Sequence, residues 1–530
     1  MSNVSAFKLI LLTLIVMVGL QLLAKRLRLP PAIALLIGGV GMAFIPGLPP
    51  VTLDPDLILI VFLPPLLMYG AYFSVWDDLK RHLRGILLLA IGAVVFTTFA
   101  VGIAVHLAVP SLPWAACFAL GAIVSPPDAV AAKAVLERLS LPRGLMVLLE
   151  GESLLNDAAG LVLVRFAVAA ALTGAFSAQQ ALLTFSVLAI GGVVVGAVLG
   201  YLVVLTLRYL KDDYLVITVT LLAAWVSYIA GETLDVSGVI ATVACGLTIG
   251  WYQHEVFSAA VRIRATAFWQ VLIFLFEALV FILIGLSLRG VVVRLALANH
   301  GDGWMTFAPA IAAVVATVVL SRFVWIFGVD AIGVAYRRLR GQAIPASTWR
   351  ASTVMSWAGM RGVVTLAIAL SLPETMPGRD LILLASFAVI FATVLVQGIT
   401  IGILIKWLNP EHTHPANSRH LSEPQVVAQL DAAQLAAIEP LVHDAKGDLI
   451  HPRLYEQYRY RAELMQRIRE TNSYPRDAVA AHYTIVLTAI AAARTELLKM
   501  HRDGLVHDEL LHTIERDLDY QEVSAQDAMA

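Results

Sequence analysis

The sequence is dominated by apolar runs about as long as a lipid bilayer is thick. A spanning helix needs roughly 20 mostly apolar residues, because hydrocarbon offers no partner for backbone N–H and C=O groups. This criterion predicts thirteen spans and hence an all-α polytopic membrane protein. The predicted spans are residues 5–24, 31–46, 56–75, 85–109, 113–136, 144–173, 180–207, 213–231, 236–251, 267–288, 307–336, 351–372 and 380–408.

The composition agrees with this class and excludes several others. Of the 530 residues, 59% are hydrophobic and 14% are charged, whereas soluble domains carry roughly 25% charged residues. The net charge of -1 shows no excess of basic residues of the kind that nucleic-acid-binding proteins carry. Cys117 and Cys245 lie in apolar runs and predict no disulfide framework. No cluster of positive charge precedes the first apolar run, so a cleavable signal peptide is not expected.

The loops between the predicted spans differ in charge. Those on one side hold sixteen Lys and Arg, and those on the other side hold only Arg289, Arg294 and Arg379. Because basic loops stay in the cytoplasm, we expect an outside N-terminus, a cytoplasmic C-terminus and a plasma-membrane (bacterial inner-membrane) location. If the seventh span is a linker, the two sets of six spans run in opposite directions. This is the inverted repeat common in secondary transporters.

From Glu411 onward the composition changes to that of a soluble segment. It holds nineteen acidic residues, twelve basic residues and nine of the 13 histidines. We therefore divide the chain into a membrane unit, residues 1–408, and a cytoplasmic helical regulatory tail, residues 409–530. The histidines could sense pH, although a solvated helical surface is the favoured interpretation. The ligand or partner of the tail is left open.

The fifth predicted span contains Ser125, Pro126, Pro127 and Asp128 in succession. Two consecutive prolines remove two N–H donors, so the helix should break there. A broken helix beside a carboxylate is a common way for transporters to build an ion site. The alternative is a structural kink in which Asp128 caps the second half-helix, and both interpretations can hold together.

The sixth span is denser in polar groups, with Glu150, Glu152, Ser153, Asn156 and Asp157 within eight residues. The i,i+4 spacing places the Ser153 hydroxyl and the Asp157 carboxylate on one helix face. Such oxygen ligands suit Na⁺, and a buried carboxylate can exchange a cation for a proton. The alternative is a polar cluster that only holds helices together. Glu150, nearer the cytoplasmic end, is interpreted as a vestibule or interfacial residue.

Three further ionisable residues, Arg322, Arg361 and Glu277, lie deep in later spans. A buried guanidinium needs a carboxylate or backbone carbonyls, and Glu152 is the expected partner of Arg322. Arg361 lies in the twelfth span, where it could neutralise the C-terminal dipole of a broken helix. For Glu277, pairing across the bundle and lining the cytoplasmic pathway both remain open.

These motifs resemble those of the sodium/proton exchangers of the cation:proton antiporter-1 family. The matching segments are LPPLLMYGAYF, SPPDAVA, EGESLLNDA, the deep Arg322, GMRGVVTLAIALSLP and VQGITIGILIKWL, which run in the family order. The resemblance implies thirteen helices, two of them discontinuous and crossing. It also implies a core domain of about 85–173 and 307–408, a dimerisation domain from the remainder, a homodimer, and no cofactor.

The resemblance also implies roles for individual residues. Asp157 would bind the cation and the proton in turn, with Ser153 and Asp128 completing a site for a monovalent cation. Asn156 would orient the site, and Glu152 with Arg322 would form a core ion pair. Ser125, Pro127, Arg361, Glu277 and Glu150 would support the site or its pathway.

Two departures from the family pattern concern cation selectivity. Pro127 stands where the family commonly has Thr, and Tyr69 stands where many members carry an acid. Both departures remove a possible oxygen ligand, so the choice among Na⁺, K⁺ and Li⁺ is left open.

The leading expectation is electroneutral Na⁺/H⁺ exchange by alternating access, serving pH and sodium homeostasis. A single titrating carboxylate in the Asn156–Asp157 pair argues for one proton per cation. The alternatives are K⁺(Rb⁺)/H⁺ antiport and a tail-gated cation channel. An enzyme is not expected, because the spans adjoining Ser153 contain no histidine to act as a base.

Overall fold

A computed structural model describes residues 3–27, 29–45, 55–128, 142–174, 177–298, 303–341, 348–408, 423–443, 448–471, 476–503, 505–506 and 508–528. The chain divides into two units, Met1–Thr413 and His414–Ala530. Within the described residues the secondary structure is helical, apart from one isolated bridge between His443 and Leu449.

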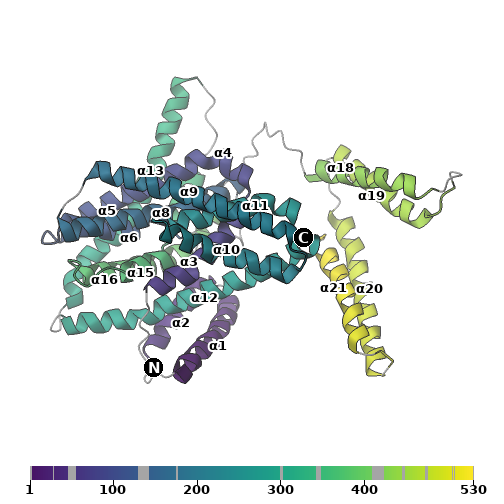
Figure 1. Ribbon diagram of the computed structural model, residues 1–530, viewed down its shortest axis with the longest axis horizontal. Helices are drawn as coiled ribbons and strands as arrows, with labels where there is room; N and C mark the ends of the chain where they lie inside the picture. The colour runs from purple at the N-terminus through teal and green to yellow at the C-terminus, as the bar shows by residue number, and fades with distance from the viewer. Residues whose placement is uncertain are drawn as a thin grey trace. The chain divides into compact units, whose positions relative to one another are not determined.

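The first unit is a bundle of long helices (Figure 1). Its elements are α1 (Asn3–Leu27), α2 (Pro31–Ala43), α3 (Pro55–Tyr72), α4 (Trp76–Leu87), the π-helical turn η1 (Leu88–Ala93), α5 (Val94–Ala108), α6 (Trp114–Val124), α8 (Arg143–Thr173), α9 (Ala178–Tyr209), α10 (Asp213–Thr233), α11 (Gly238–Val256), α12 (Ala259–Ala298), α13 (Gly303–Leu339), α14 (Thr348–Trp357), α15 (Val363–Leu370), α16 (Arg379–Ala392), the π-helical turn η2 (Thr393–Gln397) and α17 (Gly398–Leu408).

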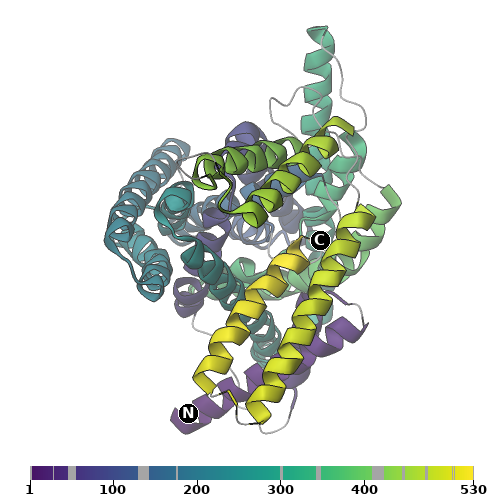
Figure 2. The ribbon, with the colours of Figure 1, turned by 90° about the vertical axis from the view of Figure 1, so that its right-hand side faces the viewer.

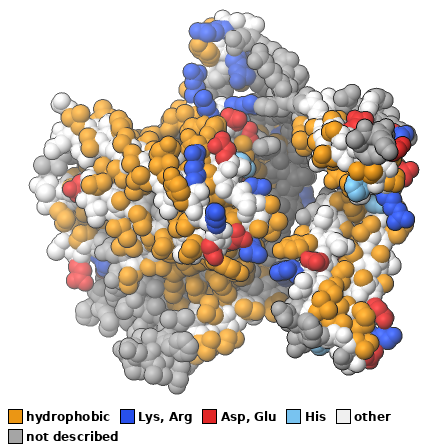
Figure 3. Space-filling model, turned by 45° about the vertical axis from the view of Figure 1, so that its right-hand side comes forward, with side chains coloured by type: hydrophobic (Ala, Val, Ile, Leu, Met, Phe, Trp, Pro, Cys, Tyr) orange, Lys and Arg blue, Asp and Glu red, His pale blue; other side chains and the backbone are white. Residues whose placement is uncertain are grey.

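Seven helices of the described chain are long and apolar enough to cross a membrane, and three shorter apolar helices accompany them. Much of the face in Figure 3 is covered by hydrophobic side chains, as expected for a surface in contact with lipid. The chain is thus a multi-pass membrane protein. The count of thirteen spans and the inverted repeat remain predictions.

Several helices begin at a side chain that caps them. The hydroxyls of Ser177 and Ser237 accept hydrogen bonds from the first turns of α9 and α11, and Asp212 does the same for α10. Such caps satisfy backbone N–H groups that have no partner within the helix. Gly174, with a φ of 71°, ends α8 in the left-handed conformation that glycine adopts readily.

The structure differs from the predicted spans at one place that bears on function. The fourth span was expected to begin at residue 85, but a continuous helix begins at Trp76. The sequence WDDLKRHLRGIL forms the amphipathic helix α4, whose charges had indicated a loop. The twelfth span, 351–372, is divided into α14 and α15, with Gly359 and Gly362 in the interruption, which agrees with the discontinuous helices that the family resemblance implies. The second half of the fifth span, 129–136, lies outside the described residues.

Small residues allow close contact between the helices that frame the bundle. A Cβ at Gly285 of α12 would overlap the backbone of α2, and one at Gly196 of α9 would overlap the backbone of α11. Close backbone approach of this kind is typical of membrane helices, where packing replaces the hydrophobic effect. Further contacts join α6 to α5 and α8, and α13 to α5.

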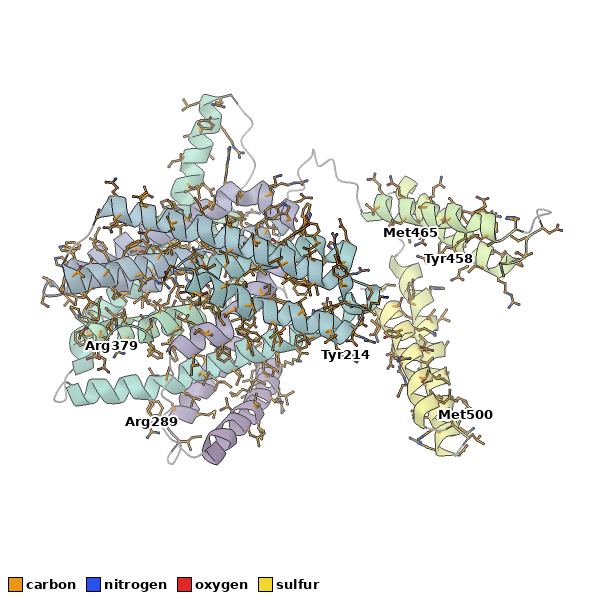
Figure 4. All side chains as sticks on the ribbon, in the orientation of Figure 1. Tyr214, Arg289, Arg379, Tyr458, Met465 and Met500 are labelled. Carbon is orange, nitrogen blue, oxygen red and sulfur yellow. The ribbon has the colours of Figure 1, made fainter. Side chains whose placement is uncertain are left out.

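Labelled side chains show the two ends of the bundle. Arg289 and Arg379 lie at one end and Tyr214 lies at the other (Figure 4). The two arginines thus share a side, as the loop assignment requires. Which side faces the cytoplasm stays a prediction.

The second unit contains two pairs of helices. α18 (Glu423–Ile438) packs on α19 (Pro452–Thr471), and α20 (Arg476–Arg502) packs on α21 (Asp508–Asp527), the latter pair lying side by side in Figures 1 and 2. Arg494 joins α20 to α21 by donating hydrogen bonds of 2.5 Å to Asp519 and Glu522.

Candidate ion-binding site

The end of one helix and the interruption of another meet in the middle of the bundle. α6 ends at Val124, and the residues that follow, through Asp128, are not helical; α14 ends at Trp357, and helix resumes at Val363. The backbone N–H of Asp128 donates a hydrogen bond of 2.7 Å to the carbonyl of Met360. The segment that follows α6 and the interruption between α14 and α15 are therefore joined through main-chain atoms.

Arg361 supplies positive charge to the end of α6. Its side chain is 1% exposed and donates hydrogen bonds to the carbonyls of Val124 (3.0 Å) and Ser125 (3.3 Å), and to that of Gly359. The last carbonyls of a helix have no partner within it and carry partial negative charge. The guanidinium satisfies these groups, which is how the buried end of α6 is stabilised.

Asn156 of α8 holds the interrupted segment from the other side. Its Nδ2 donates a hydrogen bond of 2.6 Å to the Pro127 carbonyl. Its Oδ1 is buried and has no hydrogen-bond partner in the described part of the chain. The Ser125 hydroxyl donates to the Ala122 carbonyl at 3.0 Å and accepts from Thr98 at 3.3 Å. Asn156 and Ser125 thus support the backbone around Asp128.

A cavity of about 130 Å³ lies beside these segments. It brings together the acidic and hydroxyl groups that the sequence singled out, and apolar residues of α3, α12 and α15 complete its wall. Its polar lining residues are Tyr69, Asp128, Glu150, Ser153, Asp157 and Glu277. Glu277 is among the lining residues, and its role in pairing or in the pathway stays a prediction. Asn156, Pro127, Ser125 and Arg361 do not line it.

Asp157 is the most distinctive member of this group. Its side chain is 7% exposed, and it makes no hydrogen bond or ion pair to another residue within the ranges the structure describes. A carboxylate in this position can take a proton or a cation to relieve the cost of burial. Gly362 leaves room for the neighbouring Asp128, since a Cβ at Gly362 would overlap the Asp128 carboxylate.

Glu152 and Arg322 form a buried ion pair behind the cavity. The guanidinium donates hydrogen bonds of 2.5 and 2.7 Å to the two carboxylate oxygens, and its Nε donates to the Met355 carbonyl at 3.1 Å. The two residues are 1% and 3% exposed. These contacts connect α8, α13 and α14. The two charges neutralise each other, and neither residue lines the cavity.

Sequence reasoning missed two groups that hold the site. The Met360 carbonyl accepts from Asp128, and the Thr393 hydroxyl accepts the backbone N–H of Arg361 at 3.1 Å. Thr393 begins the π-helical turn η2, a feature that often marks functional sites. Neither a backbone acceptor nor a π-helical turn has a sequence signal that would have identified it.

A helix end and an interrupted helix that meet beside buried carboxylates are typical of one class of protein, the secondary transporters of cations. The profile described as "Sodium/hydrogen exchanger, transmembrane" matches residues 10–407. The chain therefore belongs to the sodium/hydrogen exchanger family of the cation:proton antiporter-1 group.

Individual relatives agree with the family assignment. The chain is 34% identical over 387 residues to the "Sodium, potassium, lithium and rubidium/H(+) antiporter" of Bacillus pumilus, a match that covers 71% of this chain and 57% of that protein. It is 30% identical to the "Uncharacterized Na(+)/H(+) exchanger YjcE" of Escherichia coli, over 89% of this chain and 90% of that protein. The fold is similar to that of the sodium proton antiporter MjNhaP1 from Methanocaldococcus jannaschii, with a TM-score of 0.60, 20% identity, and coverage of 78% of this chain and all of that chain.

Proposed function

We propose that the protein is a secondary active antiporter that exchanges one Na⁺ for one H⁺ by alternating access, and that it is not an enzyme. The observation that carries the proposal is the position of Asp157, buried in a cavity with the Ser153 hydroxyl and the Asp128 carboxylate. A carboxylate and a hydroxyl are hard oxygen ligands that suit Na⁺.

The coupling follows from competition for one carboxylate. Asp157 holds either a proton or a cation, and moving the empty, charged site through the membrane is costly. The two buried arginines described above do not satisfy Asp157, because Arg322 is engaged by Glu152 and Arg361 by backbone carbonyls. Asp128 contributes to cation binding while remaining ionised through the cycle. The cycle then moves no net charge.

A second candidate is exchange of K⁺ or Rb⁺ for protons. The Bacillus pumilus relative is named for sodium, potassium, lithium and rubidium, and Pro127 and Tyr69 leave this site with fewer oxygen ligands than the family pattern. A loosely coordinated site discriminates less between cations of different size.

The proposal extends to the assembly and its placement. We expect a homodimer in the plasma membrane with a cytoplasmic C-terminal tail, in which the helices of residues 85–173 and 307–408 move as a core against the remainder. Glu150 and Glu277 line the aqueous route to Asp157 and favour entry of cations over anions.

Exchange in proteoliposomes tests the assignment. Vesicles that contain the purified protein and a pH-sensitive dye are given gradients of Na⁺, Li⁺, K⁺ or Rb⁺, and proton movement is followed. Asp157→Asn should abolish exchange while the protein remains folded and dimeric. The control is Asp380→Asn, at an exposed position in the first turn of α16, which should retain exchange. Coupled transport by folded Asp157→Asn protein would refute the role of this carboxylate, and conductance without coupling would indicate a channel.

A further inference from the structure

A second cavity, of about 460 Å³, lies among α4, α8, α9 and α11. Leu154 of α8 lines both this cavity and the one that contains Asp157. The two cavities thus share one wall residue. Its lining residues are Trp76, Leu79, Leu83, Ile86, Gly151, Leu154, Leu155, Val193, Ala197, Ile240, Val243, Ala244, Leu247, Thr248, Trp251 and Tyr252.

The lining of this cavity suits a hydrocarbon ligand and no ion. Its described lining contains no charged side chain. Of its two hydroxyls, on Thr248 and Tyr252, that of Thr248 donates to the Ala244 carbonyl at 2.7 Å. Several lining residues are also exposed on the outer surface of the bundle, among them Val193 and Leu83. Such a surface faces lipid in a membrane protein, so the cavity is accessible to lipid chains.

Two tryptophans mark one end of the cavity. Trp76, the first residue of α4, and Trp251, near the end of α11, make an edge-to-face contact with ring centroids 6.3 Å apart. Tryptophan is enriched where hydrocarbon meets headgroups. From Trp251 the cavity follows α11 back to Ile240, a rise of about 16 Å at 1.5 Å per residue. This is roughly half of the ~30 Å hydrocarbon thickness, or the depth of one leaflet.

Two basic side chains follow Trp76 along α4, about 6 Å and 12 Å farther along the helix axis, and such long side chains can extend their charged ends toward the headgroups. Lys80 and Arg84 of α4 are exposed, and neither has an ion-pair partner within the described part of the chain. At 100° per residue they lie beside the stripe of α4 that begins with Trp76 and faces the cavity. The acidic residues of α4, Asp77 and Asp78, belong to its first turn, where the helix dipole favours negative charge.

We propose that this cavity binds one acyl chain of an anionic phospholipid, whose phosphate is held by Lys80 and Arg84. The elements fit this ligand in three respects: an apolar cavity as deep as one leaflet, tryptophans at headgroup level, and cationic side chains one and two turns along α4 from Trp76. The site is lined by α4, α8, α9 and α11, and α8 also carries Asp157. An occupied cavity would therefore fix the spacing between these helices and change the rate of transport.

Lipid binding to the intact protein tests this proposal without reference to transport. Native mass spectrometry of the detergent-solubilised chain would measure binding of phosphatidylglycerol and of phosphatidylethanolamine, with inorganic phosphate as a third ligand. The wild-type protein should bind phosphatidylglycerol more tightly than phosphatidylethanolamine, and phosphate alone should not compete. Lys80→Gln/Arg84→Gln should weaken phosphatidylglycerol binding about 30-fold, from the usual contribution of two basic residues at a membrane surface.

A second pair of variants tests whether the apolar cavity holds the acyl chain. Ala197→Phe places a ring in the cavity from the exposed helix α9, and Val198→Phe adds the same ring at the adjacent, exposed position that does not line it. Ala197→Phe should lose the bound lipid, and Val198→Phe should keep it. Arg337→Gln/Arg338→Gln, at the end of α13, controls for loss of two surface charges. Equal binding of the two lipids, full competition by phosphate, or test variants that match their controls would overturn the proposal.

Discussion

Breaking the ion pair between Glu152 and Arg322 should destabilise the membrane unit more than any single surface substitution. The two charges are almost fully buried and joined by hydrogen bonds of 2.5 and 2.7 Å. Arg322→Ala would leave the Glu152 carboxylate buried without its partner and also free the Met355 carbonyl. Removing one member of a buried pair costs about 3–5 kcal/mol. Glu152→Ala should have a cost of the same size.

The double variant Glu152→Ala/Arg322→Ala shows how much of the loss in unfolding free energy comes from a buried charge without a partner and how much from lost packing. With both charges gone, no uncompensated charge is buried. Its loss of stability should therefore be clearly smaller than the sum of the two single variants. Unfolding of the detergent-solubilised protein by sodium dodecyl sulfate, followed by tryptophan fluorescence, gives the free energies needed for this cycle.

An exposed ion pair on the same helix provides the control. Arg165 of α8 donates a hydrogen bond of 3.0 Å to Glu232, and both side chains are substantially exposed. Exposed pairs contribute about 0–1 kcal/mol, so Arg165→Ala should have little effect on unfolding. If Arg322→Ala proves no more destabilising than Arg165→Ala, the buried pair does not stabilise the fold and the reasoning is refuted.

Three further predictions concern the candidate site and its coupling. Gly362→Ala should slow exchange in proteoliposomes by roughly tenfold or more, because the added Cβ overlaps the Asp128 carboxylate and overpacking costs about 1–3 kcal/mol. The control Gly328→Ala, where a Cβ meets no atom within 4 Å, should exchange at the wild-type rate, and equal rates for both variants would contradict the expected overlap. Asn156→Ala should lower the free energy of unfolding by about 1–3 kcal/mol, because the buried Pro127 carbonyl loses its donor; an unchanged value in the dodecyl sulfate assay would mean that this hydrogen bond is dispensable. The Na⁺ gradient at which proton flux stops should not change when a K⁺/valinomycin membrane potential is imposed, because an electroneutral cycle moves no net charge. An extra proton per cycle would add about 2.3 kcal/mol per 100 mV to the driving force, so a voltage-dependent null point would disprove electroneutrality.

The helices that cross the membrane could be predicted because lipid imposes one simple requirement on them. An apolar run of sufficient length must satisfy its own backbone, so hydropathy locates most of the helices. The amphipathic helix α4 escaped this criterion, since Lys80, Arg81 and Arg84 break the apolar run that hydropathy detects, while its apolar stripe still packs on the bundle. Its existence depends on a tertiary contact with α8, which hydropathy does not report.

The site was predictable in its side-chain pairs and unpredictable in its backbone contacts. Helical spacing places Ser153 and Asp157 on one face, and the cost of a buried guanidinium points to a carboxylate for Arg322. Asn156 and Arg361 instead bind carbonyls that are 29 and 237 positions away in the sequence. Every residue has a carbonyl, so the sequence gives no indication of which one a donor will find.

The hydrogen bond from the Asp128 amide to the Met360 carbonyl has a consequence for how such a transporter can diversify. A main-chain donor is present at every residue except proline, so this hydrogen bond does not depend on which other side chain stands at position 128. Substitutions beside it, such as a different residue at position 127, can therefore change the oxygen ligands offered to a cation while the main-chain hydrogen bond between the two segments is kept.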